Sequence, residues 1–574
     1  MNKFLLLAIS FTIPFVFPLN ASAQDDDEFS RIATRIMNSY QDENTDSLKD
    51  ASLGWHGGAY MGASTQGRTI PSASFTYKSN EKFLFTGDIA GNITEKTTGK
   101  SVATFYNNGT GKRANTDILT NGQNIHAKVR FDYAAWKGSI LTFGILESYN
   151  NTKEKNSSAV AFLDGQGVEY CAKYENRTRS IHDLKMGYLL QYIQKFESGD
   201  KLTTRVNIKH NHLSANVDKS TWAMSASDYN ASREHHKMNN FDPYGMMKFQ
   251  SRSYGAFSWG LSEKYTINRI RTEHAADRFN FNTCSSLSSL NMQIAAGCFS
   301  FAASGDYEYF DHRSNDFTHS EILKYYNNWM ANAKASFAIT GNHSIVFNFN
   351  RSVTHPEYEE LDPYENIGSD ITLIYMGNSD LEPSKSWLYG GRYHYKDNHL
   401  KGSISASFEH IKDDIAPVAS HHPVTNLTIK TWKNDVSFGK FMFDARGEVS
   451  SGAFNMTFGA RAQRLSYGSD YKSDGKLWSY SFKVRPQVEL PGKWTLATSL
   501  LYQGRENHLT YYNRGYTYLS VRAVKQMGPW AIYGFVQDIL ERDRVQVLHD
   551  VDNTVYTYKD LNARALILGA SYKF

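Results

Sequence analysis

The feature that most constrains this chain is a strict alternation of apolar and polar residues that recurs along it. From Ile125 to Tyr133 every odd-numbered residue is apolar or aromatic, and every even-numbered residue is polar or charged. A helix would scatter these charges around its surface, whereas a β-strand places all of them on one face. The same period returns in residues 202–209, 299–309, 328–339, 403–409 and 566–574. The sequence therefore predicts an all-β chain.

The lengths of the segments and of their connections favour a membrane barrel over a soluble sheet. The segments run to roughly 9–14 residues, near the number that crosses a bilayer at a tilt. Short connections at 340–342 and 396–398 alternate with long polar stretches at about 212–250 and 354–384, the arrangement of bacterial outer-membrane barrels. We therefore predict a transmembrane antiparallel β-barrel. At roughly 23–30 residues per strand, its length gives about 18–22 strands.

Composition agrees with this fold and excludes other classes. The mean hydropathy is −0.52 and the formal net charge is +4. Barrel strands average to such a polar score, because lipid-facing and lumen-facing residues alternate. The 36 tyrosines and 34 phenylalanines suit side chains at a lipid–water boundary. The small net charge, with no basic block among aromatics, argues against a nucleic-acid partner.

Both ends of the chain carry export signals. A signal peptide is predicted over residues 1–23, from the basic Lys3, the apolar run 4–19 and the small-x-small sequence 21–23. Residues 24–52 open with four acids and predict a short periplasmic arm, and residues 53–574 form the barrel. At the other end, Tyr572 and Phe574 close a strand with an apolar residue at every second position. This ending resembles the signal that the outer-membrane assembly machinery reads, so we expect that machinery and outer-membrane lipid as partners, in a Gram-negative cell.

Two motifs in the second half resemble a known family. They are His355-Pro-Glu-Tyr-Glu-Glu-Leu-Asp-Pro363 and Gly377-Asn-Ser-Asp-Leu-Glu-Pro383, and residues 536–540 add Val-Gln-Asp-Ile-Leu. In this order they are similar to the barrel of TonB-dependent receptors, where the prolines and glycines shape a loop between strands. The family's plug domain has no counterpart in the roughly 29 residues between Gln24 and the first strand. The resemblance therefore covers the barrel portion only, and plug gating is not implied.

The resemblance implies nutrient uptake or transport across the outer membrane. If the histidine pairs described below form a site, a transition metal or haem is the candidate cargo. A separate plug, receptor or surface lipoprotein would then be a partner. The alternative is a surface-exposed binding barrel without transport, and the third hypothesis is a barrel enzyme. The sequence has no Ser/His/Asp grouping, HExxH, Walker loop or CxxC pair. We therefore predict no enzymatic activity and no cofactor.

Two sets of residues are candidates for a site. The first is the histidine pairs, which would ligate a metal if several loops converged; solvated loop histidines are the alternative. The second is the polar face of two strands, which we expect to face the lumen. The metal candidates are His235, His236, His421 and His422, and the lumen candidates are His126, Lys128, Arg130, Asp132, Arg205 and Lys209.

Three further expectations concern what fills the lumen, how the two faces of a strand tolerate charge, and whether two cysteines are bonded. A barrel this wide needs an occupant, and the candidates are the acidic arm, an inward loop such as 212–250, or a partner protein. Asp132→Arg should be tolerated because its side chain faces the lumen, unlike Phe131→Arg on the lipid face. Cys284 and Cys298 either form a disulfide or remain thiols.

Overall fold

The structure is a computed structural model in which the described chain begins at residue 53. It describes residues 53–574 except 66, 108–109, 165, 167, 224–229, 275–276, 316–319, 364–365, 368–372, 422–427, 468–477, 509–510, 541–544, 549–554 and 558–563. The predicted signal peptide (1–23) and arm (24–52) lie outside the described residues. No helix in the described part of the chain is long and apolar enough to cross a membrane.

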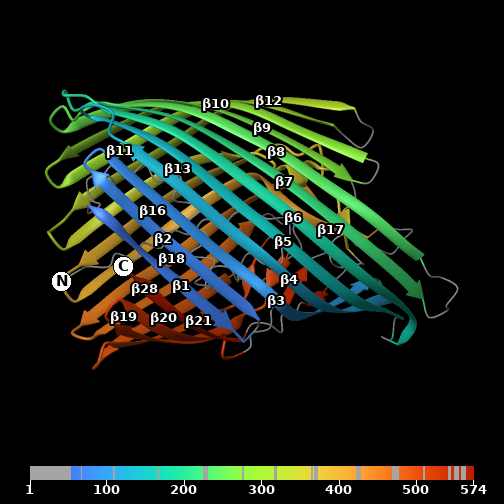
Figure 1. The fold of residues 1–574 in the computed structure, drawn as a ribbon. Helices are drawn as coiled ribbons and strands as arrows, with labels where there is room; N and C mark the ends of the chain where they lie inside the picture. The colour runs from blue at the N-terminus through green and yellow to red at the C-terminus, as the bar shows by residue number, and fades with distance from the viewer. Residues whose placement is uncertain are drawn as a thin grey trace.

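The main sheet is a closed antiparallel barrel, which confirms the predicted fold (Figure 1). It holds 24 described strands; β14 and β15 form a loop hairpin, and the other 22 close the barrel. The first barrel strand pairs with both the second and the last. The barrel strands are β1 (Gly54–Ser64), β2 (Arg68–Asn80), β3 (Phe83–Asn107), β4 (Thr110–Tyr133), β5 (Ser139–Leu163), β6 (Glu169–Lys195), β7 (Lys201–Ala223), β8 (Asn230–Gln250), β9 (Phe257–His274), β10 (Asp277–Ala296), β11 (Phe299–Asn315), β12 (Glu321–Ala338), β13 (His343–Thr354), β16 (Ser384–Lys396), β17 (Leu400–His421), β18 (Thr428–Ser451), β19 (Phe454–Tyr467), β20 (Trp478–Leu490), β21 (Trp494–Gln503), β24 (Tyr516–Met527), β25 (Trp530–Gln537) and β28 (Ala565–Lys573).

The remaining elements belong to three connections at one end of the barrel. The β13–β16 connection carries α3 (Tyr358–Leu361), β14 (Asn366–Ile367) and β15 (Leu373–Tyr375). The β21–β24 and β25–β28 connections form a separate four-stranded sheet. Its strands are β22 (Glu506–Asn507), β23 (Tyr511–Asn513), β26 (Val545–Leu548) and β27 (Val555–Thr557).

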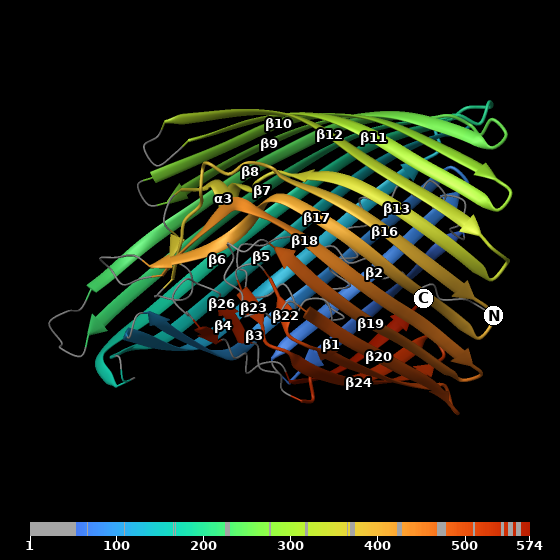
Figure 2. The same cartoon turned by 180° about the vertical axis from the view of Figure 1, so that it is seen from behind.

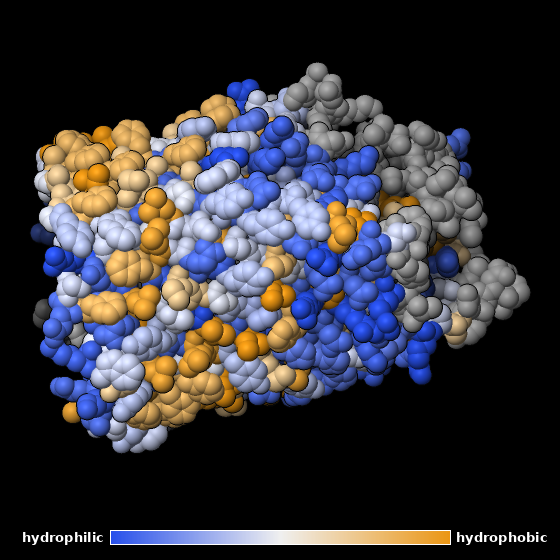
Figure 3. Space-filling view, turned by 90° about the horizontal axis from the view of Figure 1, so that it is seen from above, coloured by the Kyte–Doolittle hydropathy of each residue, from blue (hydrophilic) through white to orange (hydrophobic). Residues whose placement is uncertain are grey.

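The two ends of the barrel differ. Short turns, such as those after β12 and β16, join strands at the end where the chain terminates (Figure 1). Apolar side chains gather over the half of the wall nearer these turns, and hydrophilic ones cover the other half (Figure 3). Outward residues of the apolar half include Trp329, Phe347 and Leu568, which are 58–63% exposed. This half therefore has the surface of a lipid-facing belt.

Several strands are far longer than the sequence predicts. β3 to β8 contain 21–27 residues each, although about 9–11 cross a bilayer. In the half of the wall away from the belt the outer face is polar as well, so the period-two pattern fades while the hydrogen-bonded pairing of the strands continues. For the same reason the predicted long loop at 212–250 is wrong, because residues 212–223 and 230–250 continue β7 and β8. The predicted loop at 354–384 is confirmed as a connection between barrel strands.

Candidate functional site

The β13–β16 connection folds inward and packs on the inner wall. We call the described residues of this connection, 355–363, 366–367 and 373–383, the inner loop. Leu361 and Leu381 of this loop are each 1% exposed. They share a buried apolar cluster with Met238 of β8, Ile270 of β9 and the β10 residues Phe279 and Phe281. Ile415 of β17 and Trp432 of β18 pack against the same cluster. The inner loop therefore contacts two separate sectors of the wall, and Figure 2 shows α3 inside the barrel outline beside β7 and β17.

Both family motifs fold the loop onto itself. The N–H of Gly377 donates to the carbonyl of Asp362 at 2.7 Å, and the N–H of Asn378 donates to Glu360 at 2.6 Å. A Cβ added at Gly377 would lie 2.5 Å from backbone atoms of Asp362, so only glycine fits this approach. The first motif forms α3, where the side chain of Glu360 accepts from the N–H of Glu357 at 2.8 Å. The motifs thus hold the two halves of the loop together.

Polar contacts fix one side of the inner loop to β11 and β12. Nε2 of His355 lies 2.8 Å from Oε2 of Glu308, and its ring stacks on Phe310 at 3.6 Å between centroids. Asn328 donates to the same carboxylate at 3.0 Å. Nζ of Lys324 donates to the carbonyl of Leu381 at 2.9 Å. These partners lie on the inner face of strands whose alternation the sequence shows, but nothing in the sequence assigns them to the loop.

Further contacts fix the other side of the loop to β18. The amide of Asn378 donates to the carbonyl of Trp432 at 2.9 Å. In return, the amide of Asn434 donates to the carbonyl of Glu382 at 2.6 Å. The inner loop is therefore held from both directions across the lumen, as an internal strap.

The turn formed by α3 concentrates acidic side chains. Burial, together with repulsion from Glu357, raises the pKa of Glu359 to about 7. The pKa of Glu360 also rises to about 7, because of burial and repulsion from Glu357 and from Asp414 of β17. Burial raises the pKa of Glu357 as well. The docked loop therefore favours protonated carboxyls near neutral pH.

The predicted lumen residues lie on the inner face of β4 and β7 but form separate contacts. His126, Lys128 and Asp132 are buried, on the face opposite the exposed Ile125 and Tyr133. Asp132 accepts from Nε of Arg130 at 2.9 Å and from Thr142 at 2.5 Å. Arg205, also buried, donates to Gln191 at 2.8 Å. Lys209, which is half exposed, lies 4.0 Å from Asp242. The expectation that Asp132→Arg would be tolerated therefore conflicts with the structure, because Asp132 is the acceptor of a buried network.

A family model described as the outer membrane protein beta-barrel family matches residues 134–572. The chain belongs to this family. Its location is therefore the outer membrane, as predicted. In such barrels the short turns are periplasmic, so the polar half of this outer-membrane barrel and its inner loop lie on the extracellular side.

Solved structures share the fold at low sequence identity. The FrpB iron transporter from Neisseria meningitidis gives a TM-score of 0.57 at 10% identity, over 93% of this chain and 83% of that one. The copper transporter OprC gives 0.63 at 10% identity, over 91% and 81%. The alcaligin outer-membrane receptor FauA from Bordetella pertussis gives 0.58 at 11% identity, over 91% and 76%. No curated protein matches the chain in sequence. The predicted likeness to receptor barrels is thereby confirmed at the level of the fold.

Of the four histidine candidates, the structure describes the side chains of His235 and His236, and these two do not meet. His235 and His236 are neighbours on β8, so their side chains point to opposite faces of the wall. Nδ1 of His235 lies 2.6 Å from Asn216, and His236 lies 3.4 Å from Glu234. The side chain of His421, and all of His422, lie outside the described residues. Within the described ranges, no group of three His, Cys, Asp or Glu side chains is placed to hold a metal ion.

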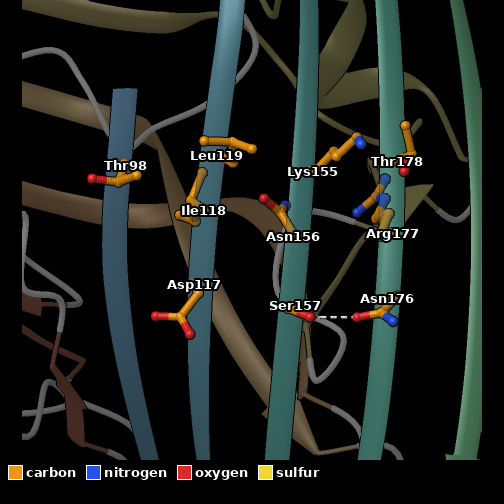
Figure 4. Close-up of a pocket in the computed structure, with 10 residues that line it drawn as sticks. All are labelled: Thr98, Asp117, Ile118, Leu119, Lys155, Asn156, Ser157, Asn176, Arg177 and Thr178. Atoms are coloured by element: carbon orange, nitrogen blue, oxygen red, sulfur yellow. Dashed lines mark hydrogen bonds between the residues drawn. The ribbon is translucent and has the colours of Figure 1, made fainter. Parts of the chain in front are cut away.

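A cavity of about 640 Å³ lies on the wall of the extracellular half, across β3 to β6. Figure 4 shows that Lys155, Asn156 and Ser157 of β5 lie beside Asn176 and Arg177 of β6. The buried Asn156 donates to Glu154 at 2.7 Å. The cavity is therefore lined by both hydrogen-bond donors, such as Arg177, and acceptors, such as Asp117. It is separate from the inner loop.

Cys284 and Cys298 are both free thiols. Cys284 lies within β10 and Cys298 in the following turn. At about 3.4 Å per residue an extended strand separates them by on the order of 45 Å, whereas bridged cysteines have Cα atoms within about 7 Å. The disulfide alternative is therefore wrong.

Proposed function

We propose that the chain is an outer-membrane receptor that admits a nutrient through its barrel, with the inner loop as the gate. The observation that carries this proposal is the attachment of the loop to two sectors of the inner wall, through His355 on one side and Asn378 on the other. A strap anchored at both ends narrows a 22-strand lumen that inward side chains alone do not fill. Release of either anchor would widen the passage.

The printed names of similar structures suggest the first cargo to test. They include an iron transporter, a copper transporter and a siderophore receptor. A chelated metal, haem included, is therefore the cargo class that we propose. The acidic arm and a separate plug or surface lipoprotein stay in the proposal as additional closures of the lumen.

Single-channel recording in planar bilayers tests the gate. We compare the mature chain, a variant in which a glycine–serine linker replaces residues 357–382, and a variant lacking residues 24–50. If the inner loop is the gate, the mature chain conducts little and the linker variant opens a large conductance. A large conductance only in the variant that lacks residues 24–50 would assign the gate to the arm. Equal large conductance in all three would reject a gate, and silence in all three would favour a binding barrel without permeation.

Uptake in cells tests the cargo. A strain deleted for the gene, complemented with the wild-type chain, should accumulate radiolabelled chelated iron or haem faster than the uncomplemented strain. Equal accumulation would reject this cargo class but would leave the conductance result unaffected.

A further inference from the structure

Basic side chains form a band on the outer surface of β8 to β11, on the extracellular half of the wall. We define the basic band by its six cations: Arg233, Lys237, Arg269, Arg271, Arg278 and Arg313. On these outward faces the described acids above the belt are Glu273 and Asp311. Asp218 of β7, which pairs with Arg233, and Glu321 of β12, near Arg313, flank the band. With these included, six cations stand against four acids, and the sector keeps a formal charge of +2.

The alternation of each strand shows that the band points outward. On β9, Tyr265 has the same parity as Arg269 and Arg271 and is 50% exposed. The residue between these arginines, Ile270, is buried under the inner loop. On β10, Phe279 is likewise buried, so its neighbour Arg278 lies on the opposite face.

The band begins where the apolar belt ends. Strand pairing places Arg269 between Phe241 of β8 and Asn282 of β10. Asn282 pairs with Arg313, which pairs with Leu323 of β12. Phe241 and Leu323 are 41% and 46% exposed. Arginines and apolar side chains therefore share one row, and the other cations of the band lie farther toward the extracellular end.

The charges of the band are only partly neutralised. Arg271 and Arg278 lie 3.1 Å and 3.3 Å from the same oxygen of Glu273. Arg313 lies 3.4 Å from Asp311. Arg233 donates to Asp218 of the neighbouring strand β7 at 2.5 Å. Lys237 and Arg269 form no ion pair with another described residue. A surface that shares one carboxylate between two guanidiniums retains positive charge for an anionic partner.

We propose that the basic band binds the phosphorylated headgroups of the glycolipid in the outer leaflet. Three features favour this partner. The band continues the lipid-facing belt, so one lipid would place its acyl chains on the belt and its headgroup on the band. Guanidinium groups bind phosphate oxygens in a bidentate manner. Basic clusters at a membrane surface are attracted to anionic headgroups. The band thus serves as a lipid collar, independent of what passes through the lumen.

Native mass spectrometry of the purified barrel in detergent tests the proposal. The probes are diphosphorylated lipid A and the same lipid with both phosphates removed. The test variant is Arg269→Gln with Arg271→Gln and Arg278→Gln. The matched control is Lys82→Gln with Lys137→Gln and Lys401→Gln, which removes three cations from the periplasmic end. Migration of unboiled samples on gels shows whether each variant is folded.

The expected result is preferential binding of the phosphorylated lipid by the wild-type and control barrels. The band variant should bind it at least tenfold more weakly, and added salt should reduce the difference by screening. Equal affinity of the wild type for both lipids, or no loss in a folded band variant, would overturn the proposal. Either result would make an acidic protein the occupant to be sought next.

Discussion

At the scale of single residues, the two faces of β4 impose opposite demands on neighbouring positions. The ring of Phe131 contacts Phe85 at 4.7 Å and Phe143 at 6.5 Å between centroids, in a row of aromatics on the outer face. Asp132, 1% exposed, lies on the inner face and accepts from Arg130 and Thr142. Phe131 is stabilised by contact with lipid and aromatic neighbours, whereas Asp132 is stabilised by hydrogen bonds from a guanidinium and a hydroxyl group.

Phe131→Arg should destabilise the barrel by about 2–4 kcal/mol, the cost of a basic side chain near the bilayer midplane. Reversible unfolding by guanidinium in lipid vesicles measures the change. Phe131→Leu is the control, because it keeps an apolar side chain on the same face. An arginine variant as stable as the leucine variant would place this position outside the belt.

Asp132→Arg should also be destabilising, by about 3 kcal/mol or more, because it leaves the partly buried Arg130 without its carboxylate and places a new cation at a buried position. The same unfolding assay applies. Asp132→Asn, which keeps an acceptor for Thr142, should cost less. If the arginine variant were as stable as the asparagine variant, the network around Asp132 would not contribute to the stability of the barrel.

At the scale of elements, the inner loop combines an apolar core with polar anchors. Its leucines remove apolar surface from water, while its hydrogen bonds fix the direction in which the loop lies. The anchors come from three strands, β11, β12 and β18. Weakening one anchor should therefore loosen the loop without unfolding the wall.

His355→Ala should increase the frequency of channel opening several-fold, because it removes the contact with Glu308 and the stack on Phe310. Single-channel recording measures this frequency. The control is His343→Ala, since His343 lies at the periplasmic end of β13. Unchanged opening in both variants would show that the histidine anchor does not hold the gate.

Acidification should strengthen docking of the inner loop. The pKa of Glu359 and of Glu360 rises to about 7 in the docked loop, above the ordinary value of 4.5. A raised carboxyl pKa makes docking most stable below about pH 4.5, and this contribution is lost as pH rises through 7. Channel opening should therefore be rarer at pH 5.5 than at pH 8. Glu359→Gln with Glu360→Gln should remove much of this dependence, and an unchanged pH profile in that variant would contradict the assignment.

The elements that the sequence predicts well are those within the bilayer. Alternation identifies β4 and β12 because lipid on one side and water on the other act on successive residues. Above the belt, water lies outside the wall, so segments such as Asn230–Asn240 lose the pattern and resemble a loop. The anchors Glu308 and Lys324 were not predicted either, because pairing a wall residue with a loop residue requires the register of several strands. The family motifs predicted the position of the inner loop but not its inward fold.

At the scale of the whole molecule, the barrel has no sheet edge because β1 and β28 pair over seven residues. Phe574 adds backbone hydrogen bonds to Gly57 in both directions, each at 3.0 Å. The outward side chains of β28, Leu568 among them, continue the apolar belt across this seam. Closure therefore depends on the final residues of the chain.

Deletion of Tyr572 to Phe574 should prevent barrel assembly while leaving export intact, because it removes the bonds to Gly57 and outward aromatic side chains. Fractionation of membranes, with gels of unboiled samples, measures the folded population. Phe574→Tyr is the control, because it keeps an aromatic ring at the end of the strand. Normal outer-membrane levels of the truncated chain would contradict this role.

The pairing of the first and last strands also sets when the barrel can form. Gly58 pairs with Lys573, a separation of 515 residues, so the closing contact is among the least local that this chain can make. Contacts of such separation form slowly, because a long segment of chain must be ordered before they contribute. Until the C-terminal strand has been synthesised and delivered, the other 21 strands have an open edge at each side. Folding is therefore a post-translational event, and the barrel strands must be kept from premature association until the last of them arrives.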